Sequence, residues 1–392
     1  NPPGLSDDVF RYVWEGGLVA EGKSPYAHAP SSPERAPERE AWPRIYREMN
    51  NKDVSAAYPP AAQVGFAVVS TLAGGPAAQG GERAVLAMRI AFALADLAVL
   101  GVILVALRRR GMGAARAVIW GWSPLIVFEF AGAAHFDSLG ILALLAGLVV
   151  LERDPRHRLG RVREGLGNAL LATGVLVKLL PLFVVPFTLR ESRRRGFAAL
   201  VLVAVALLWS VPILVSDDGA TGLFGGIGAY ASRWESFSLV FRFVDAPLRG
   251  LGDWIGGDGV LAREESRRLV ARTLVALAWG GVALRCFRRR MRPLDAAPAL
   301  LGAFLVLTPT LHPWYLAWVL AFLALRPSFA WPFLVAMAPL LYWPLTRWHA
   351  EGIWVEPGWL WPVVGLPFLL LLGREAWEAR RTALRDDAEP LR

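Results

Sequence analysis

Long apolar runs are the feature that most limits how this chain can fold. Two of them cover Ala84–Leu107 and Ala198–Val215, and about 20 predominantly apolar residues suffice for a helix to cross the hydrocarbon core of a bilayer. Only 19% of the 392 residues are charged, against about 25% in soluble domains. The sequence therefore predicts an integral membrane protein and excludes a soluble Rossmann enzyme, a disulfide scaffold and a disordered regulator.

The net charge of +9 comes almost entirely from arginine, because only three of the 42 basic residues are lysines. The arginines gather in short loops between apolar runs, which is typical of cytoplasmic loops. No basic stripe interleaved with aromatic residues occurs, so nucleic acid is excluded as a partner. We place five arginine clusters on the cytoplasmic side: Arg108–Arg110 with Arg116, Arg153–Arg163, Arg190–Arg195, Arg285–Arg292 and Arg374–Arg381.

These clusters predict an all-α polytopic membrane protein, because each segment between two of them must leave the cytoplasmic side and return. Trp120–Leu151 is long enough for two spans, and Pro298–Leu372 for four. In total we expect about 11 membrane segments, with short amphipathic helices in the external loops. Since Ala84–Leu107 ends at cytoplasmic arginines, the residues before it are external, and we expect a further transmembrane helix upstream of Asn1.

The same reasoning divides the chain into five regions. They are a first external loop with juxtamembrane helices (1–82), a core transmembrane module (83–215) with a second external loop near 131–137, a long external loop (216–267), a C-terminal transmembrane module (268–373) and a cytoplasmic tail (374–392).

Arginine clusters flank both ends of Gly165–Leu189, which is long enough for only one span. We therefore predict a broken hairpin with its tip at Lys178–Pro181. Non-helical backbone at that depth requires surrounding protein or a water-filled cavity, and an ammonium there requires an anion. A lipid phosphate is one candidate anion for Lys178. The alternative is snorkelling of the side chain to the interface.

Two adjacent carboxylates, Asp7 and Asp8, lie in the first external loop. Neighbouring carboxylates repel each other, so the pair suggests a metal, a basic partner or one aspartate acting as general base. The alternative is a helix N-cap, where Ser and Asp are common.

Three further groups of polar residues fall on the external side. Glu129, His135 and Asp137 lie at the edge of a span, where ionisable residues are costly unless paired or functional; the alternative is a solvated interfacial loop. His312 begins a helix break that could form part of a site; the alternative interpretation of this segment is an aromatic belt with a proline kink. The third group, in the long external loop, contains Tyr230, Trp234 and Arg242. Together with His312, Trp314 and Tyr315 of the helix break, these are further candidates for substrate or phosphate binding.

These motifs resemble GT-C glycosyltransferases, in particular the bacterial polyprenol-phosphomannose-dependent mannosyltransferases, which are related to the GPI mannosyltransferases. The resemblance rests on the order and membrane side of short motifs along most of the chain. They are Ser6–Gly16, Ser24–Tyr26, Tyr58–Pro60, Glu129 with His135–Asp137, Lys178–Pro181 and His312–Tyr315.

The resemblance implies an inverting transfer of a sugar, mannose by analogy, from a polyprenyl-phosphate donor to a glycan, lipid or protein acceptor. The reaction would take place on the extracytoplasmic face of the bacterial cytoplasmic membrane. Asp7 would be the base, with Asp8 in reserve. Lys178, His312 and Arg242 would bind the donor phosphate, and Asp137 with His135 would orient the acceptor or the base. No metal or other cofactor is expected, although a divalent metal stays an alternative.

A transporter or flippase of lipid-linked sugars is the competing hypothesis, because it too would place Lys and His at helix breaks around a cavity. Transporters usually show paired halves with matching breaks. The first half here carries a large polar external region that has no counterpart in the second half, which favours the enzyme.

Overall fold

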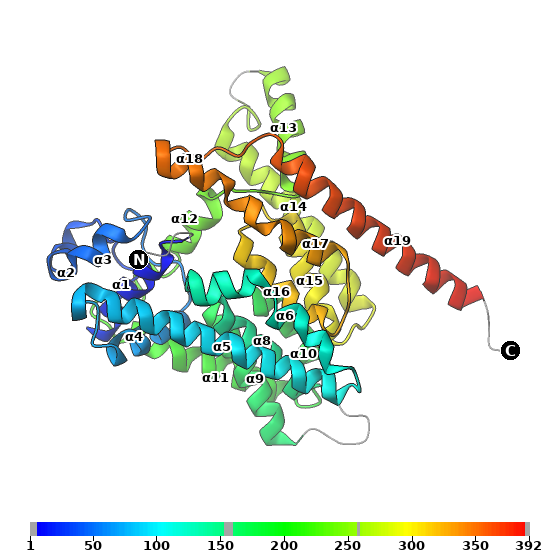
Figure 1. The fold of residues 1–392 in the computed structure, drawn as a ribbon, viewed down its shortest axis with the longest axis horizontal. Coiled ribbons are helices and arrows are strands. Elements are labelled where there is room, and N and C mark those ends of the chain that lie inside the picture. The colour runs from blue at the N-terminus through cyan, green and yellow to red at the C-terminus, as the bar shows by residue number, and fades with distance from the viewer. Residues whose placement is uncertain (1–5, 153–159, 257–258, 389–392) are drawn as a thin grey trace.

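The computed structural model describes residues 6–152, 160–256 and 259–388. Most of the predicted cytoplasmic loop at 153–163 and the end of the predicted tail lie outside these ranges. Within them, every regular element is a helix, which confirms the all-α prediction (Figure 1). The polar N-terminal region folds into a group of short helices: α1 (Asp8–Ala20), η1 (Pro33–Arg35), α2 (Ala36–Ala41), α3 (Pro43–Glu48) and α4 (Pro60–Leu72).

The first long helix, α5 (Glu82–Arg109), follows this group and coincides with the apolar run of the sequence. Glu82 occupies its first turn and Arg108 and Arg109 its last, an arrangement that complements the helix dipole. The elements after it, up to the second long span, are η3 (Ala114–Ala117), α6 (Val118–Gly121), α7 (Pro124–Ile126), η4 (Val127–Gly132), α8 (Asp137–Leu151), α9 (Arg161–Val177), η5 (Leu180–Val184), α10 (Val185–Glu191) and α11 (Arg195–Leu214).

The second half consists of two helices from the predicted long external loop, a long candidate span and several shorter helices. The last of them extends away from the other helices (Figure 1). These elements are α12 (Gly225–Arg233), α13 (Phe241–Ile255), α14 (Glu264–Arg288), α15 (Pro293–Leu307), η6 (Pro313–Leu316), α16 (Ala317–Leu323), α17 (Ala330–Met337), η7 (Ala338–Tyr342), α18 (Trp343–Glu351), η8 (Trp361–Gly365) and α19 (Leu366–Ala388).

Three of the described helices are long and apolar enough to cross a membrane: Ala78–Arg109, Arg195–Leu214 and Glu264–Arg288. A fourth candidate is the pair Pro124–Gly132 and Asp137–Leu151, which is bent by 118° at its break. The expected count of about 11 segments is therefore not confirmed. Prolines and short breaks divide many apolar runs into helices of 7 to 15 residues, such as α15 and α16.

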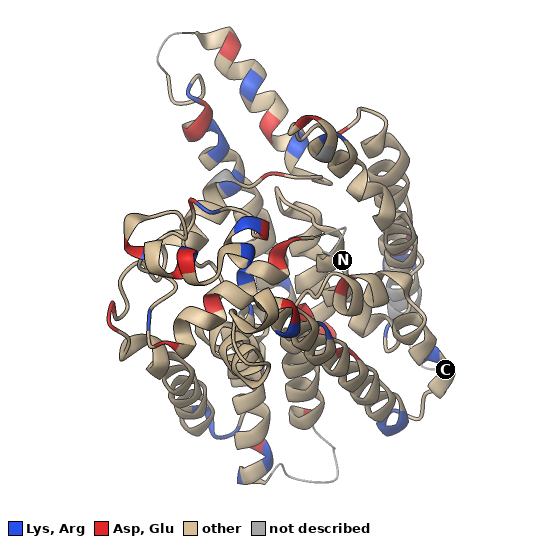
Figure 2. Ribbon diagram, turned by 60° about the vertical axis from the view of Figure 1, so that its left-hand side comes forward, with Lys and Arg blue, Asp and Glu red and all other residues tan. Residues whose placement is uncertain are grey.

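The long helices expose apolar side chains, as helices facing lipid would. Helix α11 buries only Ala198 and Ile213, whereas Leu200, Leu207 and Leu208 are all more than half exposed. Acidic and basic residues are absent from long stretches of the helices and gather near their ends and in the N-terminal group (Figure 2). These features support a membrane protein.

Hydrogen bonds join several of the predicted cytoplasmic loops at one end of the helices. Arg110 pairs with Glu152 at 2.6 Å, and Arg190 donates to the backbone carbonyls of Phe287 and Met291. Lys178 follows α9 at the end opposite to Arg161. The arginine-rich loops and the lysine of the broken hairpin therefore lie at opposite ends of that helix.

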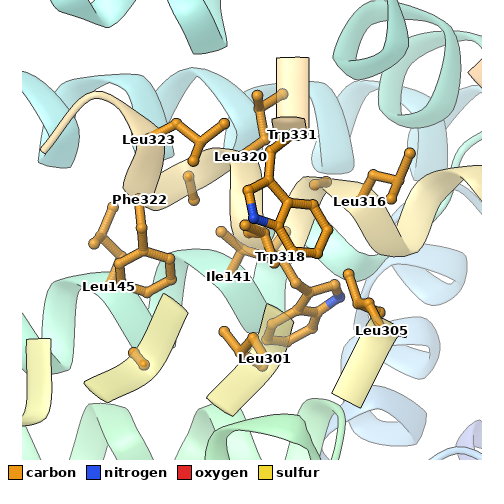
Figure 3. Packing of buried hydrophobic residues seen from close by; sticks show 14 of the residues in the cluster. Ile141, Leu145, Leu301, Leu305, Leu316, Trp318, Leu320, Phe322, Leu323 and Trp331 are labelled. Atoms are coloured by element: carbon orange, nitrogen blue, oxygen red, sulfur yellow. The ribbon is translucent and has the colours of Figure 1, made fainter. Parts of the chain in front are cut away.

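The largest core lies where α8, α15 and α16 meet. Trp318 of α16 is completely buried and lies beside Ile141, Leu301 and Leu305 (Figure 3). A methyl group at Gly140 would lie 2.7 Å from the Trp318 ring, so only glycine allows this close approach. The packing fixes the start of α8, and with it Asp137, against the second half of the chain.

Candidate active site

A cavity of about 740 Å³ lies between the N-terminal helices and the second half of the chain, a volume within the range of small-molecule sites. Its wall contains both members of the acidic pair, Asp7 and Asp8, together with Lys178. Predicted site residues from five separate parts of the chain thus face one chamber. The others that line it are Asp137, Tyr230, Trp234, His312, Trp314 and Tyr315.

The acidic pair lies at the start of α1. Asn50 donates from Nδ2 to Asp7 Oδ1 at 2.6 Å and to Asp8 Oδ1 at 2.5 Å, so one amide holds both carboxylates. The Asp7 side chain makes no capping hydrogen bond to the helix. Asp7 thus occupies the N-cap position of α1, as the alternative expects, without a capping hydrogen bond from its side chain.

The two aspartates differ in exposure. Asp7 is exposed, whereas the side chain of Asp8 is only 19% exposed. Burial, together with the charge of Asp7, raises the pKa of Asp8 to about 6, against the opposing effects of Asn50, Arg11 and Lys178. Such a carboxyl group is close to the range in which a general base works well near neutral pH.

Lys178 is the first residue after α9 and has an extended backbone. Its ammonium nitrogen lies 2.6 Å from Asp137 Oδ1, and the same oxygen accepts a hydrogen bond from Trp318 Nε1 at 2.6 Å. The ammonium also lies 4.5 Å from the centre of the Tyr315 ring. The side chain is therefore held inside the protein by a buried carboxylate, which is not the snorkelling arrangement.

Glu129 and His135 lie directly behind the cavity wall. His135 Nδ1 is 3.8 Å from Asp8 Oδ2, and His135 Nε2 is 3.5 Å from Glu129 Oε2. Both side chains are 1% exposed. The second acidic cluster of the sequence is thus in contact with the first, although the two are separated by more than a hundred residues.

A stack of three rings joins the two histidines. The Trp314 ring lies between His135, at 3.9 Å between ring centres, and His312, at 4.4 Å. Burial and the nearby charge of Lys178 lower the pKa of His312 to about 3. This histidine is neutral at physiological pH, so it would serve as a hydrogen-bond donor to a ligand and not as a cation.

Of the aromatic residues predicted for substrate binding, Tyr230 and Tyr315 share a hydrogen bond of 2.5 Å between their hydroxyl groups. Trp234 stacks on Tyr230 with ring centres 5.5 Å apart. Arg242 does not join them. Its side chain is exposed, and its guanidinium lies 5.9 Å from the centre of the Trp361 ring, away from the residues that line the cavity.

Arg272 is a cavity residue that the sequence reasoning missed. It lies on α14 and donates to Glu235 Oε1 at 2.9 Å, while Arg268 approaches the same carboxylate at 3.4 Å. Two guanidinium groups thus share one carboxylate, and the Nε atoms of both arginines are buried without a hydrogen-bond partner. The sequence signal that could have identified Arg272 is its position one turn inside an otherwise apolar run.

The sequence reasoning also missed Asn50, Tyr342 and Arg11. Tyr342 donates its hydroxyl proton to Glu129 Oε1 at 2.5 Å and lines the cavity. Arg11 is buried, pairs with Glu15 at 2.7 Å and holds the loop that carries Asn50 by donating to the carbonyl of Asn51. No spacing in the sequence relates Asn50 or Tyr342 to the acidic pair, whereas Arg11 lies in the same Ser6–Gly16 motif.

Metal ligation has no ready candidate here. Among the residues that the structure describes, no three His, Cys, Asp or Glu side chains are grouped so that they could hold a metal ion. The expectation that no metal is required stays a prediction.

Comparison with known proteins agrees with the resemblance seen in the motifs. Residues 1–194 match the profile of a family described as "Alpha-(1->6)-mannopyranosyltransferase, N-terminal domain". The first 194 residues are therefore similar to this family of mannosyltransferases. The predicted resemblance to mannosyltransferases is thereby confirmed.

A curated relative shows the same similarity over more of the chain. The protein is 25% identical over 354 residues to alpha-(1->6)-mannopyranosyltransferase B of Corynebacterium glutamicum. The match covers 82% of this chain but 56% of the relative, so the chain spans little more than half of the relative's length. No solved structure matches the chain significantly.

Proposed function

We propose that the protein is a membrane mannosyltransferase that uses a polyprenyl-phosphate-linked donor and transfers mannose to a hydroxyl group of a lipid-linked glycan, polysaccharide or protein. The reaction would occur on the extracytoplasmic face of the cytoplasmic membrane. One observation carries the proposal: a single cavity contains a carboxylate suited to act as a base and is lined on one side by α14, a candidate membrane span.

The lipid part of the donor has a matching apolar wall. Beyond Lys178, the cavity is lined by Leu180 and Phe183 of η5, by Val275 and Trp279 of α14, and by Phe304 of α15. Helix α14 is one of the candidate membrane spans. A polyprenyl chain could therefore enter from the bilayer at this wall while its phosphate stays near the polar end.

The proposed base is Asp8. Of the two aspartates it is the more buried, and its Oδ2 lies 3.8 Å from His135 Nδ1. Its carboxylate would take the proton from the acceptor hydroxyl as the oxygen attacks the anomeric carbon of mannose. The bond from that carbon to the phosphate oxygen breaks on the opposite face, so the configuration inverts. Holding donor and acceptor together in one cavity would supply much of the remaining rate.

The charge that develops on the leaving phosphate requires cations or hydrogen-bond donors. Arg272 fits this role best, because it lines the cavity, shares its carboxylate partner with Arg268 and lies one turn from the apolar wall on the same helix. Lys178 is already paired with Asp137 but retains further N–H groups, and His312 can donate one N–H. Arg242 would need to move to take part.

Replacement of Arg272 by glutamine should raise KM for the lipid donor about tenfold, because a charge-assisted contact to phosphate is lost. The expected change in kcat is smaller. Steady-state kinetics at varied donor concentration measures both constants. Arg249→Gln is the matched control, since Arg249 is also paired with a carboxylate, Asp245, but lies outside the cavity. An unchanged donor KM in Arg272→Gln would remove Arg272 from the phosphate site.

The pH dependence of the reaction follows from the raised pKa of Asp8. A base works only when ionised, so kcat/KM should fall as the pH is lowered through about 6 and decrease about tenfold per pH unit below it. Asp7→Asn removes a negative charge that raises this pKa. The acidic limb of that variant should therefore lie at lower pH than in the wild type. A limb that disappears in Asp7→Asn would identify Asp7 as the base instead.

The function itself can be tested with the purified protein in lipid nanodiscs. Synthetic polyprenyl-phosphate mannose and, separately, a nucleotide-linked mannose are supplied with lipid-glycan acceptors, and mass spectrometry detects mannosylated product. We expect product with the lipid-linked donor and none with the nucleotide-linked donor. Product with the nucleotide-linked donor and none with the lipid-linked donor would refute the proposed donor. Movement of the lipid donor across vesicle membranes without any product would favour the transporter hypothesis.

A further inference from the structure

A chain of four side chains lies behind the cavity, and the resemblance assigns one of them, His135, only the general role of orienting the acceptor or the base. It runs from Asp8 through His135 and Glu129 to Tyr342, with the contacts given above. We propose that His135 is a positioning residue for the Asp8 carboxylate, and that Glu129 and Tyr342 fix the tautomer of its ring. This inference rests on the proposed function, in which Asp8 is the base.

The backbone around His135 supports a specific role for this side chain. Glu129 belongs to a π-helix, η4 (Val127–Gly132), and π-helical turns are frequent at functional sites. Ala134, directly before His135, has a φ angle of 61°, a conformation that costs free energy for a residue other than glycine. The surrounding fold therefore holds the histidine in place against a local backbone preference.

The His135 ring can turn little in this position. Its plane is inclined by 18° to that of Trp314, and its backbone N–H donates to the carbonyl of Glu129 at 2.8 Å. With the ring held by stacking, each nitrogen faces one carboxyl group. Glu129 Oε2 and His135 Nε2 are both buried without another hydrogen-bond partner, so each is available to the other.

Burial decides which tautomer this arrangement favours. Among the described residues, no lysine or arginine forms an ion pair with Glu129, and a buried carboxylate without a cation is costly. Glu129 therefore carries a proton on Oε2 and donates it to Nε2, while Tyr342 donates to Oε1. The ring proton then lies on Nδ1, facing Asp8 Oδ2, where it stabilises and orients the ionised carboxylate.

The contacts on either side of His135, at 3.8 and 3.5 Å, are longer than the upper limit of about 3.2 Å for an N–H···O hydrogen bond. Catalytic hydrogen bonds are often long without substrate and shorten in the reacting complex. When the acceptor hydroxyl binds to Asp8, the carboxylate would close on Nδ1, and its second oxygen would be presented to the hydroxyl proton.

The test compares variants that remove or keep the hydrogen bonds. His135→Phe retains a ring over Trp314 but loses both nitrogens. Glu129→Leu loses the donor to Nε2, whereas Glu129→Gln keeps an N–H donor and an oxygen acceptor for Tyr342. Asp96→Asn is the matched control, because Asp96 is another carboxylate that accepts a hydrogen bond from an aromatic side chain, Trp120, outside the cavity.

Each protein is assayed with polyprenyl-phosphate mannose and acceptor, and kcat and donor KM are determined separately. We expect His135→Phe and Glu129→Leu to lower kcat about 30-fold with donor KM within twofold of wild type. Glu129→Gln should stay within threefold of the wild-type kcat, and Asp96→Asn should match the wild type. The rescue of Glu129 by glutamine but not leucine is the result that a role in packing alone would not give.

Wild-type kcat in His135→Phe would overturn the proposal, as would a loss in Glu129→Gln equal to that in Glu129→Leu. If His135→Phe does not fold, the comparison of Glu129→Gln with Glu129→Leu still tests the proposal. A wild-type protein that transfers no mannose would count against the proposed function. An active wild type with unaffected variants would count against the role of His135 alone.

Discussion

Asp8→Asn is expected to lower kcat about a thousandfold while the protein still folds and binds its donor. General base catalysis typically contributes two to four orders of magnitude, and asparagine keeps the size of the side chain and an oxygen for the hydrogen bond from Asn50. Single-turnover measurements with polyprenyl-phosphate mannose would give the rate. Donor binding would be measured separately by titration with a non-transferable analogue.

Asp7→Asn is the matched control for this prediction. Asp7 is the neighbouring aspartate, it shares Asn50 as a partner, and it is exposed where Asp8 is partly buried. We expect its kcat at pH 7.5 to stay within about tenfold of the wild type, because a base contributes far more than a neighbouring charge. If Asp7→Asn loses transfer and Asp8→Asn keeps it, the two roles are exchanged.

Lys178→Met should destabilise the protein by about 3 kcal/mol, because removal of one partner leaves a buried charge unpaired. That charge is on Asp137, which is completely buried beneath the cavity wall. Thermal unfolding in detergent, followed by the fluorescence of a thiol-reactive dye at Cys286, would measure the loss; Cys286 is buried in the folded protein.

The double variant Lys178→Met with Asp137→Asn separates stability from donor binding. It should recover most of the lost stability, because neither charge is then buried alone. Its donor KM should nevertheless stay above the wild-type value if the ammonium also contacts the phosphate. A double variant as unstable as Lys178→Met would show that the pair contributes little to folding.

The sequence predicts the residues of the site better than their arrangement. The break at Lys178 and the acidic pair could be found because ionisable residues in or beside apolar sequence are rare and costly. Their convergence could not be derived, since spacing carries no information on contacts between α1, α9 and η6. Arg272 was missed because an arginine near the end of a membrane span resembles an interfacial anchor, and Arg242 was included for its place beside aromatic residues.

The prediction of membrane spans from the sequence is limited for a different reason. Counting apolar stretches between arginine clusters treats every stretch as a potential span, and this finds α5, α11 and α14. The spans expected in Trp120–Leu151 and after residue 298 are not confirmed, because prolines and π-helical turns divide the chain there into short helices. Hydropathy does not distinguish side chains facing lipid from side chains facing other helices.

The wall of the cavity is contributed by both halves of the chain, but only the first half matches the family profile. The acidic pair and the broken hairpin come from the matched half, whereas α12, α14 and η6 supply Arg272 and several aromatic residues. In the proposed mechanism the base comes from the matched half, whereas the arginine of the phosphate site lies outside it. Two homologues could keep the same base and differ in the residues that contact the donor, and similarity in the first half would not reveal the difference.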